Sequence, residues 1–270
     1  MSLGEVLRAA AEYLERKGVD SPRLDAELLL ARALGLSRLD LYTQHDRPLS
    51  DDERAAARAL VERRGRREPL AYILGDWGFR RLTLLTDARA LVPRPETEMV
   101  AERALALIEH VPEPRVLDVG TGSGAIALAI ASEHPEARVI ATDSSPDALA
   151  LARENARRLN LDVDFVETNL FDGVPGPFDL IVSNPPYVLP DEELQPELTY
   201  EPREALVDNG QTAAIAEEAR RVLDGFLVLE VHEHRAGHVR ALLTELGYAG
   251  VAITHDLAGK DRVVEAQWTL

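Results

Sequence analysis

Three glycines separated by hydroxyl residues form the segment Gly120-Thr121-Gly122-Ser123-Gly124, directly after the mostly apolar residues 116–119. Glycine lets the backbone turn sharply and approach a ligand closely, and the start of a following helix offers free N–H groups. The spacing differs from the G-x-G-x-x-G of dinucleotide-binding proteins, and no lysine follows it as in a phosphate-binding P-loop. The segment therefore predicts a ligand-binding turn between a strand and a helix, and it disfavours nicotinamide and phosphate-transfer chemistry.

Strand-like and helix-like segments alternate on both sides of this turn. A helix is predicted over residues 98–109, and helical patterns lie between most of the strands that follow. Strands are predicted over residues 116–119, 139–142, 163–166, 180–183, 226–230, 251–254 and 263–267. Such alternation predicts an α/β fold with a doubly wound, mainly parallel sheet, in which ligands bind beyond the carboxyl ends of the strands.

The beginning of the chain contains repeated helix start signals. Ser2, Ser37 and Ser50 each precede a carboxylate by three residues, a spacing that satisfies free N–H groups in the first turn of a helix. Ser21 precedes Pro22, which suits the first helical position, and we expect Ser21 to cap its helix in the same way. Apolar residues recur at helical spacing after these signals, so the segment predicts a small bundle of helices.

The apolar period changes after this helical segment. Trp77 and Phe79, then Leu82 and Leu84, alternate with other residues, which suits two short strands. The charge changes too, because residues 1–96 have a net charge of +1 and residues 97–270 one of −18. This asymmetry indicates units with different roles. We therefore predict an all-α domain over residues 1–75, a β-hairpin connector over 76–96 and an α/β domain over 97–270.

Composition excludes several classes of function. None of the 270 residues is cysteine, which excludes a disulfide framework, a thiolate zinc site and a cysteine nucleophile. No apolar run approaches the roughly 20 residues that a membrane span needs, and the first residues lack the regions of a signal peptide, so we expect a cytoplasmic protein with no membrane contact. The net charge of −17 argues against direct nucleic-acid binding, because such affinity depends on Lys and Arg.

Two smaller clusters leave alternatives open. His232, His234 and His238 lie close together, but their spacing spans a predicted strand end and a helix, so we expect no metal site. The basic run Arg63-Arg64-Gly65-Arg66-Arg67 is either a solvated helix end or a contact for an acidic partner or RNA.

An acidic residue, Asp143, ends the second predicted strand of the sheet, 19 residues after Gly124. A carboxylate at this place can accept hydrogen bonds from ribose hydroxyls. Taken alone, the glycine-rich turn can be purely structural and the acid can be a helix cap. Together, in a sheet of this topology, they predict a nucleoside site.

The corner Ser183-Asn184-Pro185-Pro186-Tyr187 follows the predicted strand at residues 180–183. Two prolines stiffen the turn and remove two N–H donors, so mostly acceptors face a ligand. The Asn184 side-chain carbonyl and the Pro185 backbone carbonyl can accept both hydrogens of an NH2 group, beside the flat ring of Tyr187. The corner is either a rigid loop end or a site for a substrate nitrogen, and its neighbours favour the second interpretation.

These motifs resemble class I S-adenosylmethionine-dependent methyltransferases that act on planar nitrogens. Within that group, residues 69–75, 92–98 and 256–262 are similar to the bacterial peptide chain release factor glutamine methyltransferases. The segment Pro93-Arg94-Pro95-Glu96-Thr97-Glu98 is the most specific marker, since a sister family that methylates a ribosomal protein usually has P-R-S-P there. The resemblance implies a seven-stranded Rossmann-like sheet, S-adenosylmethionine as cofactor and, as substrate, the glutamine of the Gly-Gly-Gln motif in release factors.

The resemblance also implies roles for individual residues. Gly120, Thr121, Gly122, Ser123 and Gly124 would surround the methionine part of the cofactor and Asp143 its ribose, while Asn169 and Leu170 would border its adenine. Asn184 would contact both cofactor and substrate, and Pro185, Pro186 and Tyr187 would complete the substrate site. Two departures stand out: Asn169 replaces a frequent Asp, and Glu230-Val231-His232 replaces an E-x-G turn.

The residues leave three rival functions. N-P-P-Y corners also occur in enzymes that methylate exocyclic amines of nucleic acids. A glutamine of a ribosomal protein is another possible substrate. A non-catalytic nucleoside-binding scaffold would keep the glycine turn but would not need the double proline. We expect a monomeric enzyme that binds its protein substrate through the helical domain, and no general base is assigned because the proton can leave after methyl transfer.

Overall fold

The computed structural model describes residues 1–270, which form two compact units. The first unit contains Met1–Asp76 and Leu194–Tyr200, and the second contains Trp77–Glu193 and Glu201–Leu270. The short stretch Leu194–Tyr200 thus groups with the helices although most of its neighbours in sequence belong to the second unit. No helix in the structure is both long enough and apolar enough to span a membrane.

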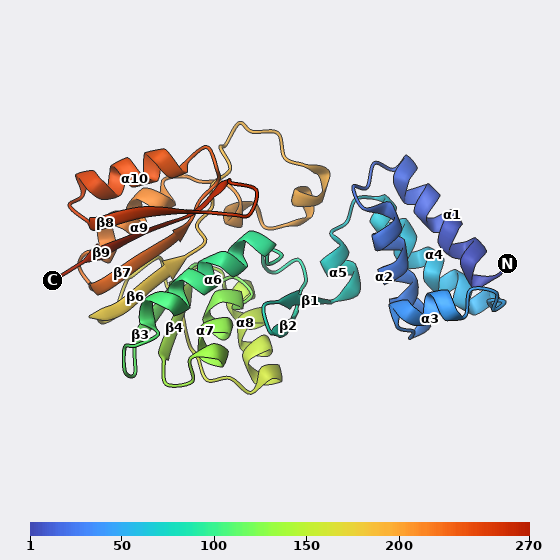
Figure 1. Cartoon of the computed structure of the whole chain (residues 1–270), viewed down its shortest axis with the longest axis horizontal. Helices are drawn as coiled ribbons and strands as arrows, with labels where there is room; N and C mark the ends of the chain where they lie inside the picture. The colour runs from blue at the N-terminus through green and yellow to red at the C-terminus, as the bar shows by residue number, and fades with distance from the viewer. The chain divides into compact units, whose positions relative to one another are not determined.

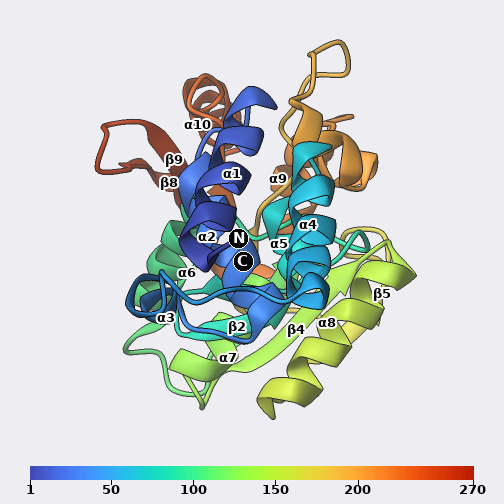
Figure 2. The same ribbon diagram turned by 90° about the vertical axis from the view of Figure 1, so that its right-hand side faces the viewer.

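The first unit is a helical bundle, whose helices α1, α2 and α4 pack side by side (Figure 2). Its apolar core is made mainly of leucines, including Leu3, Leu14 and Leu29. Its helices are α1 (Leu3–Arg16), α2 (Pro22–Leu34), α3 (Arg38–Thr43), α4 (Asp51–Gly65) and α5 (Leu70–Leu74), with a 3-10 helix at Pro196–Tyr200.

The predicted helix starts are confirmed at three of four positions. Ser2, Ser37 and Ser50 each form a capping box with the carboxylate three residues later. The prediction for Ser21 was wrong: its side chain makes no capping hydrogen bond, although Pro22 does occupy the first turn. The backbone explains the difference, since Ser21 has φ −121° and ψ 60° instead of the extended conformation of the other three caps.

The basic run at the end of α4 is neutralised inside this unit. Glu197 accepts hydrogen bonds from Arg64 Nη1 at 2.9 Å and from Arg67 Nη2 at 2.8 Å. Arg63 pairs with Glu68, and the Tyr200 hydroxyl donates to the Arg66 carbonyl at 2.8 Å. Glu197 of the stretch Leu194–Tyr200 is therefore the acidic partner of Arg64 and Arg67.

The second unit begins with a β-hairpin of β1 (Asp76–Phe79) and β2 (Leu82–Leu85). Phe79 and Leu84 are fully buried, as their alternation predicted. The next helix, α6 (Pro95–Ile108), starts three residues before the predicted position 98. Pro95 suits the first helical turn, because an N–H at that position would have no partner inside the helix. The prediction did not use this signal and therefore began the helix too late.

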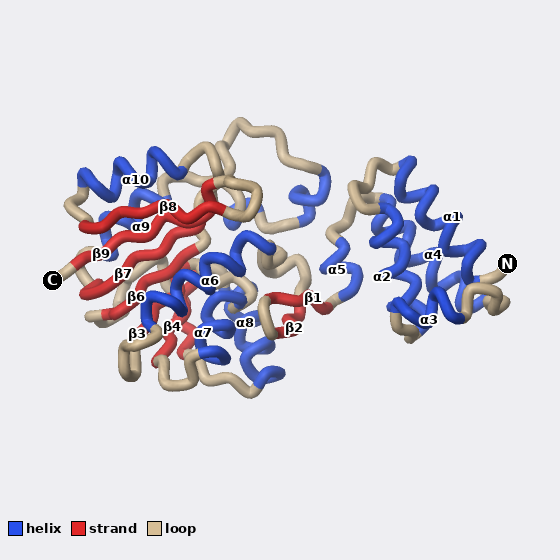
Figure 3. Tube along the Cα trace, in the orientation of Figure 1, coloured by secondary structure: helices blue, strands red, loops and turns tan.

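A seven-stranded sheet dominates the second unit, with the order β5-β4-β3-β6-β7-β9-β8 (Figures 1 and 3). All neighbouring pairs are parallel except those that involve β9. The strands are β3 (Arg115–Val119), β4 (Arg138–Asp143), β5 (Asp164–Glu167), β6 (Phe178–Ser183), β7 (Leu223–Glu230), β8 (Ala249–His255) and β9 (Asp261–Trp268). The predicted mainly parallel α/β sheet is confirmed.

Helices cover both faces of the sheet. Val116 packs in a cluster with residues of α6 and α7 (Ala125–Glu133), and its neighbour Leu117 packs in a cluster with α9 (Gln211–Ala219) and α10 (Ala236–Glu245). Successive strand residues therefore face opposite layers. Helix α8 (Pro146–Leu159) lies beside α7, and a short 3-10 helix spans Arg203–Ala205.

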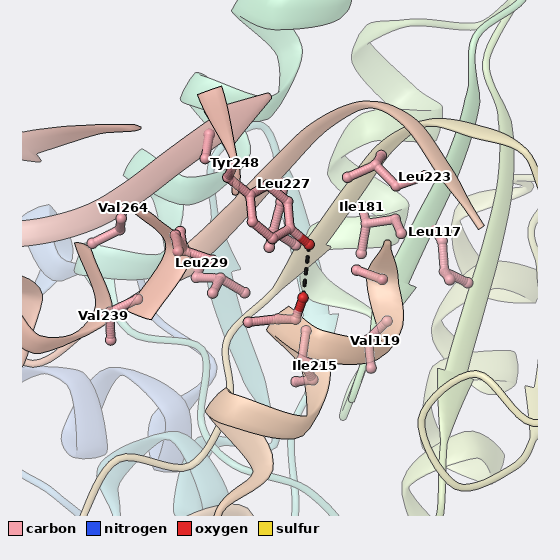
Figure 4. Close-up of a cluster of buried hydrophobic side chains, with 14 of the residues drawn as sticks. Leu117, Val119, Ile181, Ile215, Leu223, Leu227, Leu229, Val239, Tyr248 and Val264 are labelled. Carbon is pink, nitrogen blue, oxygen red and sulfur yellow. Dashed lines mark hydrogen bonds between the residues drawn. The ribbon is translucent and has the colours of Figure 1, made fainter. Parts of the chain in front are cut away.

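Figure 4 shows the core on the α9 and α10 side, where aliphatic side chains of β3, β6 and β7 meet those of the helices. The buried Tyr248 ring lies in this core, and its hydroxyl donates a hydrogen bond to the Ala216 carbonyl at 2.8 Å. Burying a hydroxyl without a partner is costly, so this bond lets the core accept a tyrosine. The packed core supports the carboxyl ends of the central strands.

Candidate active site

Three strand ends meet at one rim of the sheet. Val119 is in register with Thr142 on one side and Ser183 on the other, so Gly120, Asp143 and Asn184 leave the sheet next to one another. Two hydrogen bonds hold the strand ends together: Gly120 N–H to the Thr142 carbonyl at 2.8 Å and Ser183 Oγ–H to the Val119 carbonyl at 2.7 Å.

A pocket opens at this rim. Its lining includes most of the residues that the sequence assigned to cofactor and substrate, namely Gly120, Thr121, Gly122, Ser123, Asp143, Asn169, Leu170, Asn184, Pro185 and Pro186. Gly124 and Tyr187 are not part of this lining. The structure therefore brings the nucleoside and nitrogen sites of the sequence analysis into one cavity.

The three glycines of the turn have left-handed backbone conformations, with φ of +72°, +57° and +86° at Gly120, Gly122 and Gly124. A Cβ at Gly120 would meet nothing within 4 Å, and one at Gly122 would only reach Ala90 at 3.9 Å. A Cβ at Gly124 would lie 3.0 Å from Leu128 Cδ1 and 3.2 Å from Ala152 Cβ. Gly120 and Gly122 thus leave open space beside the pocket, whereas Gly124 allows two helices to pack.

This difference predicts that one alanine substitution mainly lowers stability and that another mainly weakens ligand binding. Gly124→Ala combines backbone strain with crowding, and we expect it to lower the free energy of unfolding by about 2–4 kcal/mol. Gly120→Ala adds only backbone strain, about 1 kcal/mol, but places a methyl group in the open space where a ligand would lie. Chemical denaturation and cofactor titration of both variants would check this; equal losses of stability would contradict the two assigned roles.

Asp143 is held at the pocket by the backbone around it. One carboxylate oxygen accepts the Gly122 N–H and the other accepts the Ser145 N–H, both at 2.9 Å. Burial raises the pKa of this carboxyl, and backbone hydrogen bonds from Ser145, Gly122 and Ser144 oppose that shift. Each carboxylate oxygen can accept more than one hydrogen bond, so Asp143 keeps acceptor capacity for the hydroxyls of a ligand.

Below the turn lies Asp118, the acid that precedes the glycines and to which the sequence analysis assigned no role. Its Oδ2 accepts the Thr121 hydroxyl at 2.7 Å and the Ala127 N–H at 3.1 Å, while the buried Oδ1 has no partner. Burial raises the pKa of this carboxyl to about 7. An unpaired buried oxygen beneath a ligand-binding turn is free to accept a hydrogen bond from a donor in the ligand or from water.

The raised pKa of Asp118 predicts a pH-dependent stability. The folded state holds the proton up to about pH 7, whereas the unfolded state releases it near 3.8. The stability contributed by this group is therefore full below pH 3.8 and falls as the pH rises to about 7. Asp118→Asn should raise the free energy of unfolding by about 1–2 kcal/mol at pH 8, where the charge is buried, and much less at pH 5. Urea unfolding at the two pH values checks this, and an equal effect at both would contradict it.

The proline corner presents acceptors to the pocket. Pro185 is buried and Asn184 half-buried, and both line the cavity. Asn184 Nδ2 donates to Thr97 Oγ1 at 3.2 Å, which leaves the Asn184 carbonyl oxygen for another donor. Tyr187 lies behind the corner with its ring 5.9 Å from that of His232, and burial raises the pKa of its hydroxyl to about 12, so it stays protonated.

Asn169 and Leu170, which the sequence analysis placed beside the adenine, line the pocket. Leu170 has a φ of +51°, and its carbonyl accepts the Thr142 hydroxyl at 3.3 Å, which ties this loop to the end of β4. The loop thus presents an apolar side chain and a carboxamide next to the Asp143 strand end. These two groups suit a flat ring with polar edges.

Sequence analysis missed several parts of the site. Residues 89–93 form one wall of the pocket, and they are held by Glu201, which accepts the Val92 N–H at 2.9 Å and pairs with Arg94. Residues 92–98 were noted only as a family marker, although the run of prolines and acids signalled a special conformation. Glu230 was noted only for the turn that it begins, and its buried carboxyl was assigned no role. The three histidines at 232, 234 and 238 form no metal-binding group, and the structure contains no other such group of three or more ligands.

Comparison with known protein families places this site in context. Residues 5–75 match the family model of the PrmC N-terminal domain, and residues 99–232 match that of the methyltransferase small domain. A release factor glutamine methyltransferase of Deinococcus radiodurans is 44% identical over 278 residues, covering 99% of each chain. One of Geobacter sulfurreducens is 42% identical, covering 97% of this chain and 95% of its own.

Solved structures share the fold at lower identity. The 16S ribosomal RNA N2 G1207 methyltransferase of Thermus thermophilus, in complex with AdoMet and guanosine, has a TM-score of 0.53 at 18% identity and covers 72% of this chain and 49% of its own. A methyltransferase of Pyrococcus furiosus has a TM-score of 0.51 at 20% identity and covers 69% of this chain and 89% of its own. Sheet order and rim pocket together define a class I methyltransferase. The chain belongs to the release factor glutamine methyltransferase family, which confirms the resemblance found in the sequence.

Proposed function

We propose that this protein transfers a methyl group from S-adenosylmethionine to the side-chain amide nitrogen of the glutamine in the Gly-Gly-Gln motif of peptide chain release factors. The observation that carries the proposal is the shared pocket, in which Asn184 and the proline corner line the same cavity as the glycine turn and Asp143. Family membership at 44% identity over nearly the whole chain supports the choice of substrate. A cytoplasmic location and a monomeric state remain predictions.

The residues present fit the cofactor. Open space at Gly120 and Gly122 leaves room beside the backbone, the free acceptor positions of Asp143 suit ribose hydroxyls, and Leu170 offers an apolar surface for the adenine. When bound, S-adenosylmethionine supplies a methyl group on a positively charged sulfur. Transfer forms a C–N bond as the C–S bond breaks, and the nitrogen afterwards loses one proton.

Geometry supplies most of the catalysis in this proposal. An amide nitrogen is a weak nucleophile, because its lone pair is delocalised into the carbonyl. The carbonyl oxygens of Asn184 and Pro185 would accept hydrogen bonds from the two N–H groups of the substrate amide. These two hydrogen bonds would aim the nitrogen at the methyl group. The same acceptors stabilise the positive charge that develops on the NH2 group during transfer. No strong base is needed before the transfer.

Methyl-labelled S-adenosylmethionine separates this function from its rivals. The purified enzyme is incubated with a release factor, with a release factor whose Gly-Gly-Gln glutamine is replaced by alanine, and with ribosomal RNA. We expect label in the first protein alone. Label in RNA alone would favour the base methyltransferase, against which the net charge of −18 over residues 97–270 counts. Label in none would favour a non-catalytic binding protein.

A further inference from the structure

A hydrogen-bonded chain of side chains starts at Asn184 of the proline corner and continues through Thr97, which also lines the pocket. Thr97, in the first turn of α6, is 4% exposed, and Glu230, at the end of β7, is 3% exposed. Asn184 Nδ2 donates to Thr97 Oγ1 at 3.2 Å, and the Thr97 side chain also hydrogen-bonds the Glu230 carboxyl. The three side chains come from separate elements, so the fold itself brings them together.

The chemistry of this chain determines its direction. An ionised carboxylate has no hydrogen to donate, so the Thr97 hydroxyl donates to Glu230. The Thr97 oxygen then has only lone pairs left to offer to Asn184, and it accepts the Asn184 NH2 group. As a result, the Asn184 amide turns its carbonyl oxygen away from Thr97.

Orientation matters because the two ends of an asparagine amide have nearly the same shape but opposite hydrogen-bonding character. With its carbonyl toward the pocket, Asn184 accepts a hydrogen from a substrate NH2 group. With its amide reversed, the NH2 group of Asn184 would face the NH2 group of the substrate, so two donors would meet. We propose that Thr97 and Glu230 are positioning residues that select the accepting orientation of Asn184. This inference rests on the proposed function, in which Asn184 holds the substrate amide.

The surroundings of Glu230 make the chain sensitive to pH. Burial raises the pKa of Glu230 to about 7, and the charged or titratable groups near it are Glu96, Arg94, Arg262 and Tyr187. Its second oxygen, Oε2, is buried without a partner. A protonated Glu230 can donate to Thr97, which removes the preference for one orientation of Asn184. The chain therefore works fully when Glu230 is ionised, above about pH 7.

A matched pair of substitutions tests the positioning role. Thr97→Val keeps the shape of the side chain and removes the hydroxyl, while Thr97→Ser keeps the hydroxyl and removes a methyl group. At pH 8 we expect Thr97→Val to lower kcat about tenfold, with the KM for S-adenosylmethionine unchanged, since it loses one ordering hydrogen bond. Thr97→Ser should stay within about twofold of the natural enzyme, because one hydroxyl replaces the other.

A second variant guards against loss of folding. Glu230→Gln keeps the shape and can either donate or accept, so it should lower kcat severalfold at pH 8. It should also lose the fall in activity below about pH 7 that we expect of the natural enzyme. An unchanged kcat in folded Thr97→Val, or equal losses in the valine and serine variants, would overturn the inference. Failure of the proposed function is distinct, because the natural enzyme itself would then not methylate the release factor.

Discussion

Asn184→Ala is expected to lower kcat by about 100-fold, roughly the effect of removing one preorganised hydrogen-bonding group from an active site. The variant loses the side-chain carbonyl that in our proposal holds the substrate amide, while the backbone of the proline corner keeps its fixed conformation. Cofactor affinity should change little, since the glycine turn and Asp143 are untouched. Steady-state kinetics with release factor, together with a cofactor titration, measures both quantities.

Asn209→Ala provides the matched control for this experiment. Asn209 is an exposed asparagine of the same unit and does not line the pocket, so its truncation removes the same atoms elsewhere. We expect its kcat to equal that of the natural enzyme. If Asn184→Ala turned over as fast as this control, Asn184 would not hold the substrate amide.

Asp143→Ala should have the second large effect, a rise of about 100-fold in the Kd for S-adenosylmethionine. Two hydrogen bonds from ribose hydroxyls to a charged acceptor are worth about 3 kcal/mol together, taking the low end of the usual range for each. The substitution also frees the Gly122 and Ser145 N–H groups that Asp143 now satisfies. Calorimetric titration of the cofactor checks the expected change.

The alternative explanation for weaker cofactor binding by Asp143→Ala is the loss of one negative charge, and Asp147→Ala tests this explanation. Asp147 lies in the first turn of α8, is exposed and does not line the pocket. Its removal changes the net charge by the same amount at nearly the same place. A comparable loss of affinity in both variants would show that general electrostatics, and not ribose binding by Asp143, holds the cofactor.

Local chemistry explains why much of the fold was predictable. The capping boxes at Ser2, Ser37 and Ser50 each involve partners three residues apart, so sequence alone reveals them. The strands were found because both faces of the sheet are covered, which makes them short apolar runs. The rim pocket followed from topology, since parallel strands end at the same edge.

Long-range partners explain what the sequence did not reveal. Thr97 and Glu230 interact across more than a hundred residues, so neither segment on its own reveals the contact. Glu197 joins Arg64 and Arg67 of the helical unit from a short 3-10 helix far along the chain. The role of Asp118 was not predicted for a related reason, since the burial of its carboxyl depends on surroundings that the sequence does not show.

Mass spectrometry of the release factor tests the central claim most directly. The factor is incubated with the enzyme and S-adenosylmethionine, digested with trypsin, and the peptide that contains the Gly-Gly-Gln motif is fragmented. Our account predicts that this peptide gains the mass of one CH2 group and that the fragments locate the gain on the glutamine side chain. An unmodified glutamine in the presence of active enzyme, with the methyl group found on another residue or in nucleic acid, would contradict it.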